Sequence, residues 1–320
     1  AIEGFEDNPE SRPLNVCILR SFTVEPSVPL LEAAALVNSI KLNVTLGGFN
    51  AYAQEILSSK SLVYRSEIDV AFIVTQTRDI APDIWSGKCE LLSERVEEII
   101  KRFESLINAF RSNSNAYLIL HNLEQPAWTS QGNLDIGSQF SQRDAINQIN
   151  LGLVEVAEKN EGVHILDYDS LVSRHGRASW SDESRWLTMR MPLGIDNLCH
   201  LVDEWLKFIV PVSGRIAKAV VVDLDNTLWG GVLGEEGIKG IHLDCDYPGG
   251  AFQEVQRILL DLYNRGILLA VCSKNDETEA LAVIEKHPGM VLKKKNFAAF
   301  KINWLDKATN IKAIARELNI

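Results

Sequence analysis

The chain has 320 residues, of which 46% are hydrophobic and 23% are charged. This composition is typical of a soluble globular protein and not of a disordered, collagenous or membrane chain. Acidic residues number 43 against 32 lysines and arginines, and the net charge of −11 argues against a nucleic-acid or membrane partner. The acidic, polar start over residues 1–13 is unlike a signal peptide, so we expect a cytoplasmic protein.

Short apolar runs alternate with helical patterns through the first two thirds of the chain. Strands are predicted at 14–22, 42–49, 69–77, 116–122 and 162–169, and helices at 29–41, 91–111 and 143–159. This alternation is typical of a parallel sheet with helices on both faces.

A second series of the same kind begins near Lys218. Its strands are predicted at 217–225, 267–273 and 290–292, and its helices at 252–265 and 277–286. The stretch between the two series contains Pro, Ser and Gly, which places a boundary around Ser213. Because single cores stop growing at roughly 250–300 residues, the sequence predicts an α/β protein of two domains, 1–213 and 214–320.

An apolar strand runs directly into Asp223 and Asp225 in VVVDLDNTLWGG. Residues two apart in a strand point to one side, so both carboxylates converge where parallel sheets bind ligands. Like charges this close need a shared cation or a proton, which indicates Mg²⁺ and a divided acid–base role. A solvated turn that caps a helix is the alternative.

Two further motifs place polar groups at the ends of predicted elements. The apolar run ILLAVCSKND ends its strand at Ser273, where a phosphate could bind, although helix capping by Ser273, Asn275 or Asp276 is the alternative. In NWLDKATN, Lys307 begins a helix, where the helix dipole disfavours a cation. This position indicates an anion in front of Lys307, with an exposed surface lysine as the alternative.

Taken in order, these residues resemble the first three motifs of the haloacid dehalogenase (HAD) superfamily of phosphotransferases: Asp223, Asp225, Thr227, Ser273 and Lys307. The resemblance implies that Asp223 is the nucleophile and Asp225 the general acid–base. It further implies that Thr227, Ser273 and Lys307 bind the phosphate and that Asp223 and Asp225 hold Mg²⁺.

Longer segments resemble the FkbH-like branch of that superfamily. They are DLDNTLWGGVLGEEG, DYPGGAFQEVQ, LLAVCSKND and FAAFKINWLDKATNI, together with LRSFTVEP and GGFNAYAQEIL in the first half. The resemblance implies an enzyme of polyketide assembly that dephosphorylates 1,3-bisphosphoglycerate and transfers its glyceryl group to an acyl carrier protein. A HAD phosphatase without acyl transfer and a non-catalytic carrier-binding module are the alternatives.

Acyl transfer requires a thiol, and Cys272 directly precedes Ser273. Lys274 and the start of a helix are expected to lower the pKa of this thiol, so Cys272 is predicted to carry the glyceryl thioester. A buried structural cysteine is the alternative, because a strand points Cys272 away from Ser273. Cys245 is the second choice; the remaining cysteines look structural, and none of the five forms a C-x-x-C pair.

The first domain resembles the SGNH-hydrolase type of flavodoxin-like fold, with Ser21 after the first strand and Asn122 after a later one. The usual Gly-Asp before the serine is missing, and Asp196 and His200 are one residue too far apart. We therefore expect Ser21 and Asn122 to be hydrogen-bonding residues of a scaffold without hydrolysis, with an active esterase as the alternative. The predicted fold class is thus two three-layer parallel-sheet domains, SGNH-hydrolase-like and then HAD-like Rossmannoid.

The second domain has three more features that bear on function. LWGGVLGEEG predicts a mobile hairpin over the substrate, or else a plain turn with Trp229 packed on the sheet. Lys293, Lys294 and Lys295 form a candidate docking patch for an acidic carrier protein, or a solvated edge. The fourth HAD motif, an acidic pair that completes the Mg²⁺ site, is missing before Ile320, which favours a truncated or excised chain.

Overall fold

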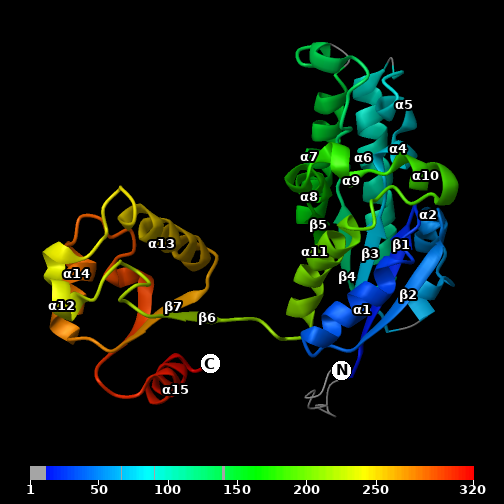
Figure 1. Ribbon diagram of the computed structural model, residues 1–320. Coiled ribbons are helices and arrows are strands. Elements are labelled where there is room, and N and C mark those ends of the chain that lie inside the picture. The colour runs from blue at the N-terminus through cyan, green and yellow to red at the C-terminus, as the bar shows by residue number, and fades with distance from the viewer. Residues whose placement is uncertain (1–11, 66, 90, 139–140) are drawn as a thin grey trace. The chain divides into compact units, whose positions relative to one another are not determined.

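The computed structural model describes residues 12–65, 67–89, 91–138 and 141–320. The acidic start that bears on localisation lies almost wholly outside these ranges. The chain divides into two compact units, of which the first ends at Arg215 and the second comprises Ile216–Ile320 (Figure 1). Within the described ranges, no helix combines the length and the apolar character needed to cross a membrane.

The first unit is built on five parallel strands in the order β2-β1-β3-β4-β5. They are β1 (Leu14–Arg20), β2 (Leu42–Phe49), β3 (Val70–Val74), β4 (Tyr117–His121) and β5 (Val163–Leu166). This order is that of the flavodoxin-like fold, as predicted. Every residue of β3 is buried, which agrees with its uninterrupted apolar sequence and with helices on both faces of the sheet.

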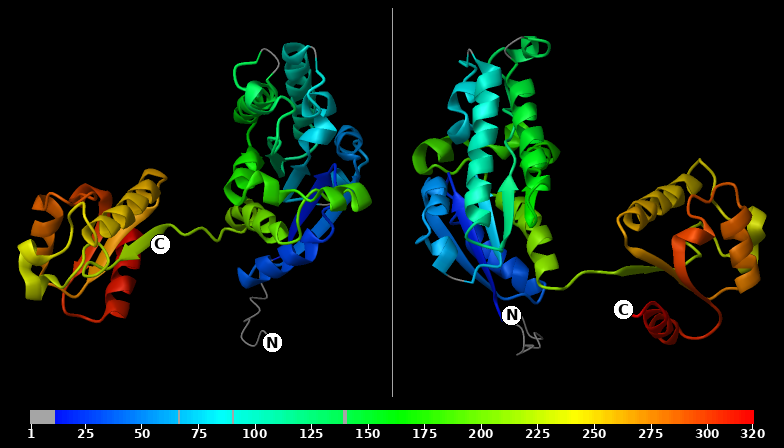
Figure 2. Two further views of the ribbon diagram at one scale, coloured as in Figure 1. Left: turned by 45° about the horizontal axis from the view of Figure 1, so that its top comes forward. Right: turned by 180° about the vertical axis from the view of Figure 1, so that it is seen from behind.

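Helices cover both faces of this sheet. One face carries α1 (Ser27–Val37), α8 (Tyr168–His175) and α11 (Asn197–Val212), whose apolar residues form one core with the sheet. The other face carries α2 (Tyr52–Leu57), α6 (Leu92–Arg111) and α7 (Gln142–Glu158), and the right-hand view of Figure 2 shows the last two side by side. The shorter helices are α3 (Leu62–Arg65), α4 (Thr77–Ile80), α5 (Pro82–Trp85), η1 (Gly132–Asp135), α9 (Arg177–Trp180) and α10 (Glu183–Met189).

The second unit has three parallel strands in the order β6-β7-β8. They are β6 (Ala219–Val222), β7 (Leu268–Ser273) and β8 (Phe297–Ile302), and the helices are α12 (Leu233–Gly240), α13 (Gly249–Asn264), α14 (Glu277–Lys286), η2 (Lys294–Asn296) and α15 (Lys307–Leu318). Leu259 of α13 and Val283 of α14 share a core with Val271 of β7. Ile314 of α15 packs against Ala270 and Cys272 on the opposite face, so this unit also has three layers.

The predicted strand at 290–292 is wrong, because the third strand is β8. Met290 and Leu292 are buried, but the backbone N–H groups of Val291 and Leu292 donate to Gln256 Oε1 at 2.8 and 3.0 Å. The Gln256 side chain therefore accepts the backbone N–H groups that would otherwise donate to the carbonyl groups of a neighbouring strand. The apolar run is core without being strand.

The segment after Asp225 also differs from the predicted hairpin. Residues 233–240 form α12, and Gly230 is paired with His242 by a single antiparallel bridge. Trp229 is fully buried. The alternative reading, in which the tryptophan packs on the sheet, describes this segment better.

Gln256 of α13 is buried and links two segments of the chain, one after β6 and one before β8. Its Nε2 donates to Leu228 O at 2.7 Å, in addition to the two bonds that Oε1 accepts. We expect Gln256→Ala to lower the free energy of unfolding by about 2–3 kcal/mol, because two buried backbone groups and one half-buried one lose their partner. Urea unfolding measures this loss. Gln253→Ala is the matched control, because it loses a half-buried bond to Gly289 O and an exposed one from Arg257; equal losses would contradict the assignment.

Candidate active site

Polar side chains from three neighbouring strands meet at one edge of the second sheet. Asp223 directly follows β6, Ser273 is the last residue of β7, and Lys307 begins α15 after β8. Because the strands are parallel, their carboxyl ends share this edge, where open α/β sheets bind ligands. The predicted residues are therefore brought together, and their catalytic roles stay a prediction.

Asp223 is the centre of this group. Lys307 Nζ lies 2.5 Å from Asp223 Oδ2, the Ser273 hydroxyl hydrogen-bonds the same carboxylate, and Leu224 N donates to Oδ1 at 2.8 Å. Burial alone would raise the pKa of Asp223, but these hydrogen bonds and the lysine charge outweigh it and lower the pKa. Asp223 is thus ionised at neutral pH, as an attacking carboxylate must be.

Lys307 stands at the first position of α15, as predicted. Asp306 caps this helix by accepting from Thr309 N at 2.9 Å. The anion that the sequence indicated in front of Lys307 is the Asp223 carboxylate, whose hydrogen bond raises the pKa of the lysine. About half of the lysine side chain is exposed, so a substrate oxyanion can approach it.

Asp225 is held in a different way, by three donors. Trp229 Nε1 and Leu233 N donate to Oδ1 at 2.9 and 3.2 Å, and Asn275 Nδ2 donates to Oδ2 at 2.9 Å. The sequence interpretation missed Trp229 and Asn275 as partners of Asp225. The available signal was the spacing of Asn275 two residues after Ser273; Asp276, not Asn275, caps α14.

The predicted Mg²⁺ ligands do not make a metal site by themselves. Within residues 12–320 as described, no group of three or more His, Cys, Asp or Glu side chains is placed to hold an ion. Mg²⁺ requires octahedral oxygen coordination, and the oxygens of Asp223 and Asp225 already accept from Lys307, Leu224 N, Trp229, Leu233 N and Asn275. Thr227 is half-buried in the turn after β6, where its N–H donates to Leu224 O.

The predicted lowering of the Cys272 pKa is wrong. Cys272 is 4% exposed and packs with Ala270 and Ile314 on the face opposite Ser273. Burial raises the pKa of its thiol, Lys307 lowers it in part, and Asp223 raises it further. Lys274, which was expected to lower the pKa, is exposed. A buried thiol with a raised pKa is a poor nucleophile.

The candidate docking lysines follow the Met290–Leu292 segment. Lys293 Nζ donates to Met290 O at 2.6 Å, and Lys294 Nζ lies 3.0 Å from Glu285. Lys295 is exposed. Two of the three ammonium groups are therefore engaged locally, and a role in carrier docking stays a prediction.

In the first unit, Ser21 and Asn122 are hydrogen-bonding residues, as expected. Ser21 Oγ donates to Asp79 Oδ2 at 2.7 Å and accepts from Gln76 N at 3.1 Å. Asn122 Nδ2 donates to Asp167 Oδ1 at 2.8 Å. His200, the histidine nearest to a hydrolase pattern in the sequence, stacks on His175 with ring centroids 3.7 Å apart. Ser21 is paired with an aspartate, and this pair was not predicted.

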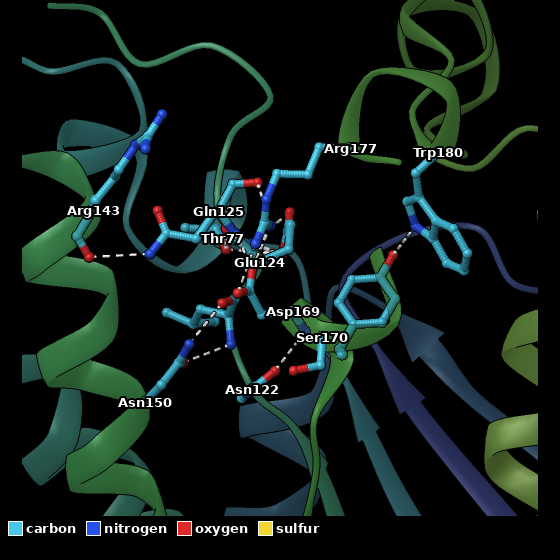
Figure 3. A network of polar contacts seen from close by, with 12 residues as sticks. Thr77, Asn122, Glu124, Gln125, Arg143, Asn150, Asp169, Ser170, Arg177 and Trp180 are labelled. Atoms are coloured by element: carbon cyan, nitrogen blue, oxygen red, sulfur yellow. Dashed lines mark hydrogen bonds and ion pairs between the residues drawn. The ribbon is translucent and has the colours of Figure 1, made fainter. Parts of the chain in front are cut away.

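A buried polar network lies beyond the carboxyl ends of β3 and β4 (Figure 3). Glu124 is buried and accepts from the Thr77 hydroxyl at 2.8 Å and from Thr77 N at 3.1 Å. Arg177 forms two bonds with Asp169, at 2.5 and 2.9 Å. Burial raises the pKa of Glu124 to about 7, although the bonds from Thr77 and the charge of Arg78 lower it in part.

This raised pKa predicts a specific pH dependence of stability. The unfolded chain loses the Glu124 proton near pH 4.5 and the folded chain near pH 7, so the Glu124 contribution to stability falls across that window. Glu124→Gln keeps an acceptor for Thr77 without a charge. We compare the Tm of Glu124→Gln with that of the wild type at each pH. We expect this difference to be a few degrees more favourable to the variant at about pH 8 than at about pH 5.

Differential scanning calorimetry at both pH values measures this difference. Burial lowers the pKa of His121 to about 3. Its contribution to the pH dependence of Tm is therefore the same in the wild type and in Glu124→Gln. The exposed substitution Glu98→Gln serves as the control. A Tm difference between Glu124→Gln and wild type that does not change with pH would contradict the assignment.

Comparison with known structures gives an extensive match. The N-terminal part of protein BF1531 from Bacteroides fragilis, described as containing a phosphatase domain and complexed with Mg, is 26% identical, with a TM-score of 0.83, over 96% of this chain and 81% of that one. An acetyl xylan esterase, AlAXEase, is 12% identical with a TM-score of 0.43, over 61% of this chain and 100% of its own. A GDSL-like lipase from Bacteroides thetaiotaomicron is 13% identical with a TM-score of 0.39, over 66% of this chain and 95% of its own. The two hydrolases are too dissimilar to this chain to support an inference about its function.

Comparison of sequences gives the family. No curated protein matches the chain. The sequence model described as "FkbH, N-terminal domain" matches residues 30–210, which is more than half of the chain. The flavodoxin-like strand order of the first unit and the extensive match to the BF1531 fragment agree with this assignment. The chain belongs to the FkbH family.

Proposed function

We propose that the second unit is a HAD-type phosphatase domain and that the chain acts on 1,3-bisphosphoglycerate, transferring its glyceryl group to an acyl carrier protein. The observation that carries the proposal is the Asp223 carboxylate bound by Lys307 at 2.5 Å and by Ser273, at the ends of three adjacent strands. Membership of the FkbH family and similarity to a fragment that contains a phosphatase domain support it.

The residues divide the phosphatase chemistry between them. Asp223 attacks the phosphorus of the ester and forms an aspartyl phosphate, while the alcohol oxygen leaves and takes a proton from Asp225. Lys307 and Ser273 stabilise the charge on the transferring phosphoryl group. In the second step Asp225 accepts a proton from the water that hydrolyses the aspartyl phosphate, and Trp229, Leu233 N and Asn275 hold its carboxylate in position.

The acyl half of the substrate requires a different nucleophile. A thiolate attacks the acyl carbon, and the acyl phosphate leaves as inorganic phosphate. Exposure supports Cys245 over Cys272 for this step, because Cys245 is exposed whereas Cys272 is buried with a raised pKa. Lys293, Lys294 and Lys295 remain the proposed docking patch for the acidic carrier.

The closed environment of Cys272 also favours a second candidate, a phosphatase without acyl transfer. This candidate uses the same Asp223 site and forms no thioester on the protein. The two functions are therefore separated by the fate of the glyceryl group and not by phosphate release.

Phosphate release tests the shared site. We expect Asp223→Asn to lower the steady-state rate of phosphate release from the ester of the bisphosphate by about a thousandfold or more, because it removes the attacking carboxylate. Without carrier protein, the thiol step adds at most one phosphate per enzyme molecule, so it does not contribute to this steady-state rate. A colorimetric phosphate assay in a buffer containing MgCl₂ measures the rate. Asp261→Asn, which changes an exposed aspartate of α13, should keep the wild-type rate, and retention of activity in Asp223→Asn would contradict the site.

Intact-protein mass spectrometry tests acyl transfer. After incubation with the bisphosphate, we expect a glyceryl adduct on the wild type and on Cys272→Ser but not on Cys245→Ser, since the exposed thiol is the accessible one. Cys199→Ser, another exposed cysteine, is the matched control and should keep the adduct. Phosphate release without any adduct would support the simple phosphatase instead.

A further inference from the structure

A cavity of about 370 Å³ opens beside the buried network of the first unit, and the proposed function does not use it. We call it the Arg78 cavity; its charged and aromatic walls are Arg78, Trp85, Glu124, Trp128, Arg177 and Glu183. These residues follow β3, β4 and β5 in the chain, so the cavity lies on the carboxyl side of the sheet, where ligands bind in open α/β folds. Its volume is within the range of small-molecule sites.

Arg78 is held on several sides in this wall. Its side chain is 11% exposed, and its guanidinium lies 5.1 Å from the Trp85 ring centroid and 4.5 Å from that of Trp186. Its terminal nitrogens bind Glu183 at 2.8 and 3.3 Å, but its buried Nε has no hydrogen-bond partner. The two rings fix the plane of the guanidinium and leave one donor unused.

The two arginines of the cavity differ in how firmly their carboxylates are held. Asp169 binds Arg177 and also accepts from Gln125 N at 2.6 Å, and its side chain is 19% exposed. Glu183 is 65% exposed and is bound here by Arg78. A carboxylate from solution can therefore replace Glu183 far more readily than it can replace Asp169. It can also bind Arg78 side-on, pairing with Nε and one terminal nitrogen.

The other walls limit the kind of anion that fits. Glu124 lies in the same wall, so a monoanion that replaces Glu183 leaves the local charge unchanged, whereas a dianion adds a charge beside an acid. Pro126, Val172 and Trp128, which is 85% exposed, offer apolar surface. A ligand with a single carboxylate and a short apolar chain satisfies both walls.

We propose that the Arg78 cavity binds a small monocarboxylate with an apolar chain, whose carboxylate displaces Glu183 and pairs side-on with Arg78 Nε. Glu183 then acts as an internal competitor for the ligand. This site is separate from the Asp223 chemistry, so either proposal can fail without the other.

Isothermal titration calorimetry of the full chain with sodium butyrate tests the proposal. We expect Glu183→Gln to bind butyrate about tenfold more tightly than the wild type, since the competing carboxylate is gone. Trp128→Ala, at the exposed rim, should bind it several-fold more weakly. Glu254→Gln is the matched control, because Glu254 is 68% exposed and also pairs with an arginine; it should leave the affinity unchanged.

A second measurement identifies the contact. Butyrate should shift the arginine Nε–H NMR signal that Arg78→Lys removes, and neither 1-butanol nor inorganic phosphate should do so. The proposal is overturned if Glu183→Gln does not bind butyrate, if Glu254→Gln changes affinity as Glu183→Gln does, or if phosphate or 1-butanol binds as tightly as butyrate.

Discussion

The parallel register of β6, β7 and β8 is the constraint on which the candidate active site depends. Asp223 and Lys307 are 84 positions apart in the chain, yet the register brings the lysine to 2.5 Å from the carboxylate. The cores on the two faces of the sheet fix that register, because a slip of one residue would move each side chain of a strand to the opposite face, where it would not fit the other core. Packing far from the edge thus determines the distance between two charges at the edge.

Strand alternation decides which polar groups reach the site. Ser273 and Asn275 lie on the side of Asp223 and Asp225, whereas Cys272 points into the core with Ala270 and Ile314. Two adjacent residues of β7 therefore face opposite sides of the sheet: Cys272 packs among apolar side chains, and Ser273 contacts polar ones. The two aspartates differ for a similar reason: Asp223 faces a lysine at the exposed edge, and Asp225 is enclosed by donors from Trp229, Leu233 and Asn275.

In the first unit, the polar residues at the carboxyl edge of the sheet are mostly bound to one another. Polar residues that follow its strands are buried or half-buried, and most of them are paired, since an unpaired buried group is costly. Ser21 pairs with Asp79, Glu124 with Thr77, and Asp169 with Arg177. Ser21, which directly follows β1, thus has its hydroxyl bound by an aspartate of the same unit.

Sequence by itself determined the two-unit α/β architecture, most strands and long helices, and the group formed by Asp223, Ser273 and Lys307. The spacing of apolar residues and the polar residues at strand ends are local properties of the sequence. Because the strands are parallel, their carboxyl ends lie at the same edge of the sheet. Only the tertiary structure decided that 290–292 is core instead of strand, that Trp229 and Asn275 hold Asp225, and that burial raises the Cys272 pKa. These outcomes depend on which distant side chain fills a space or meets a donor, and no local pattern encodes that.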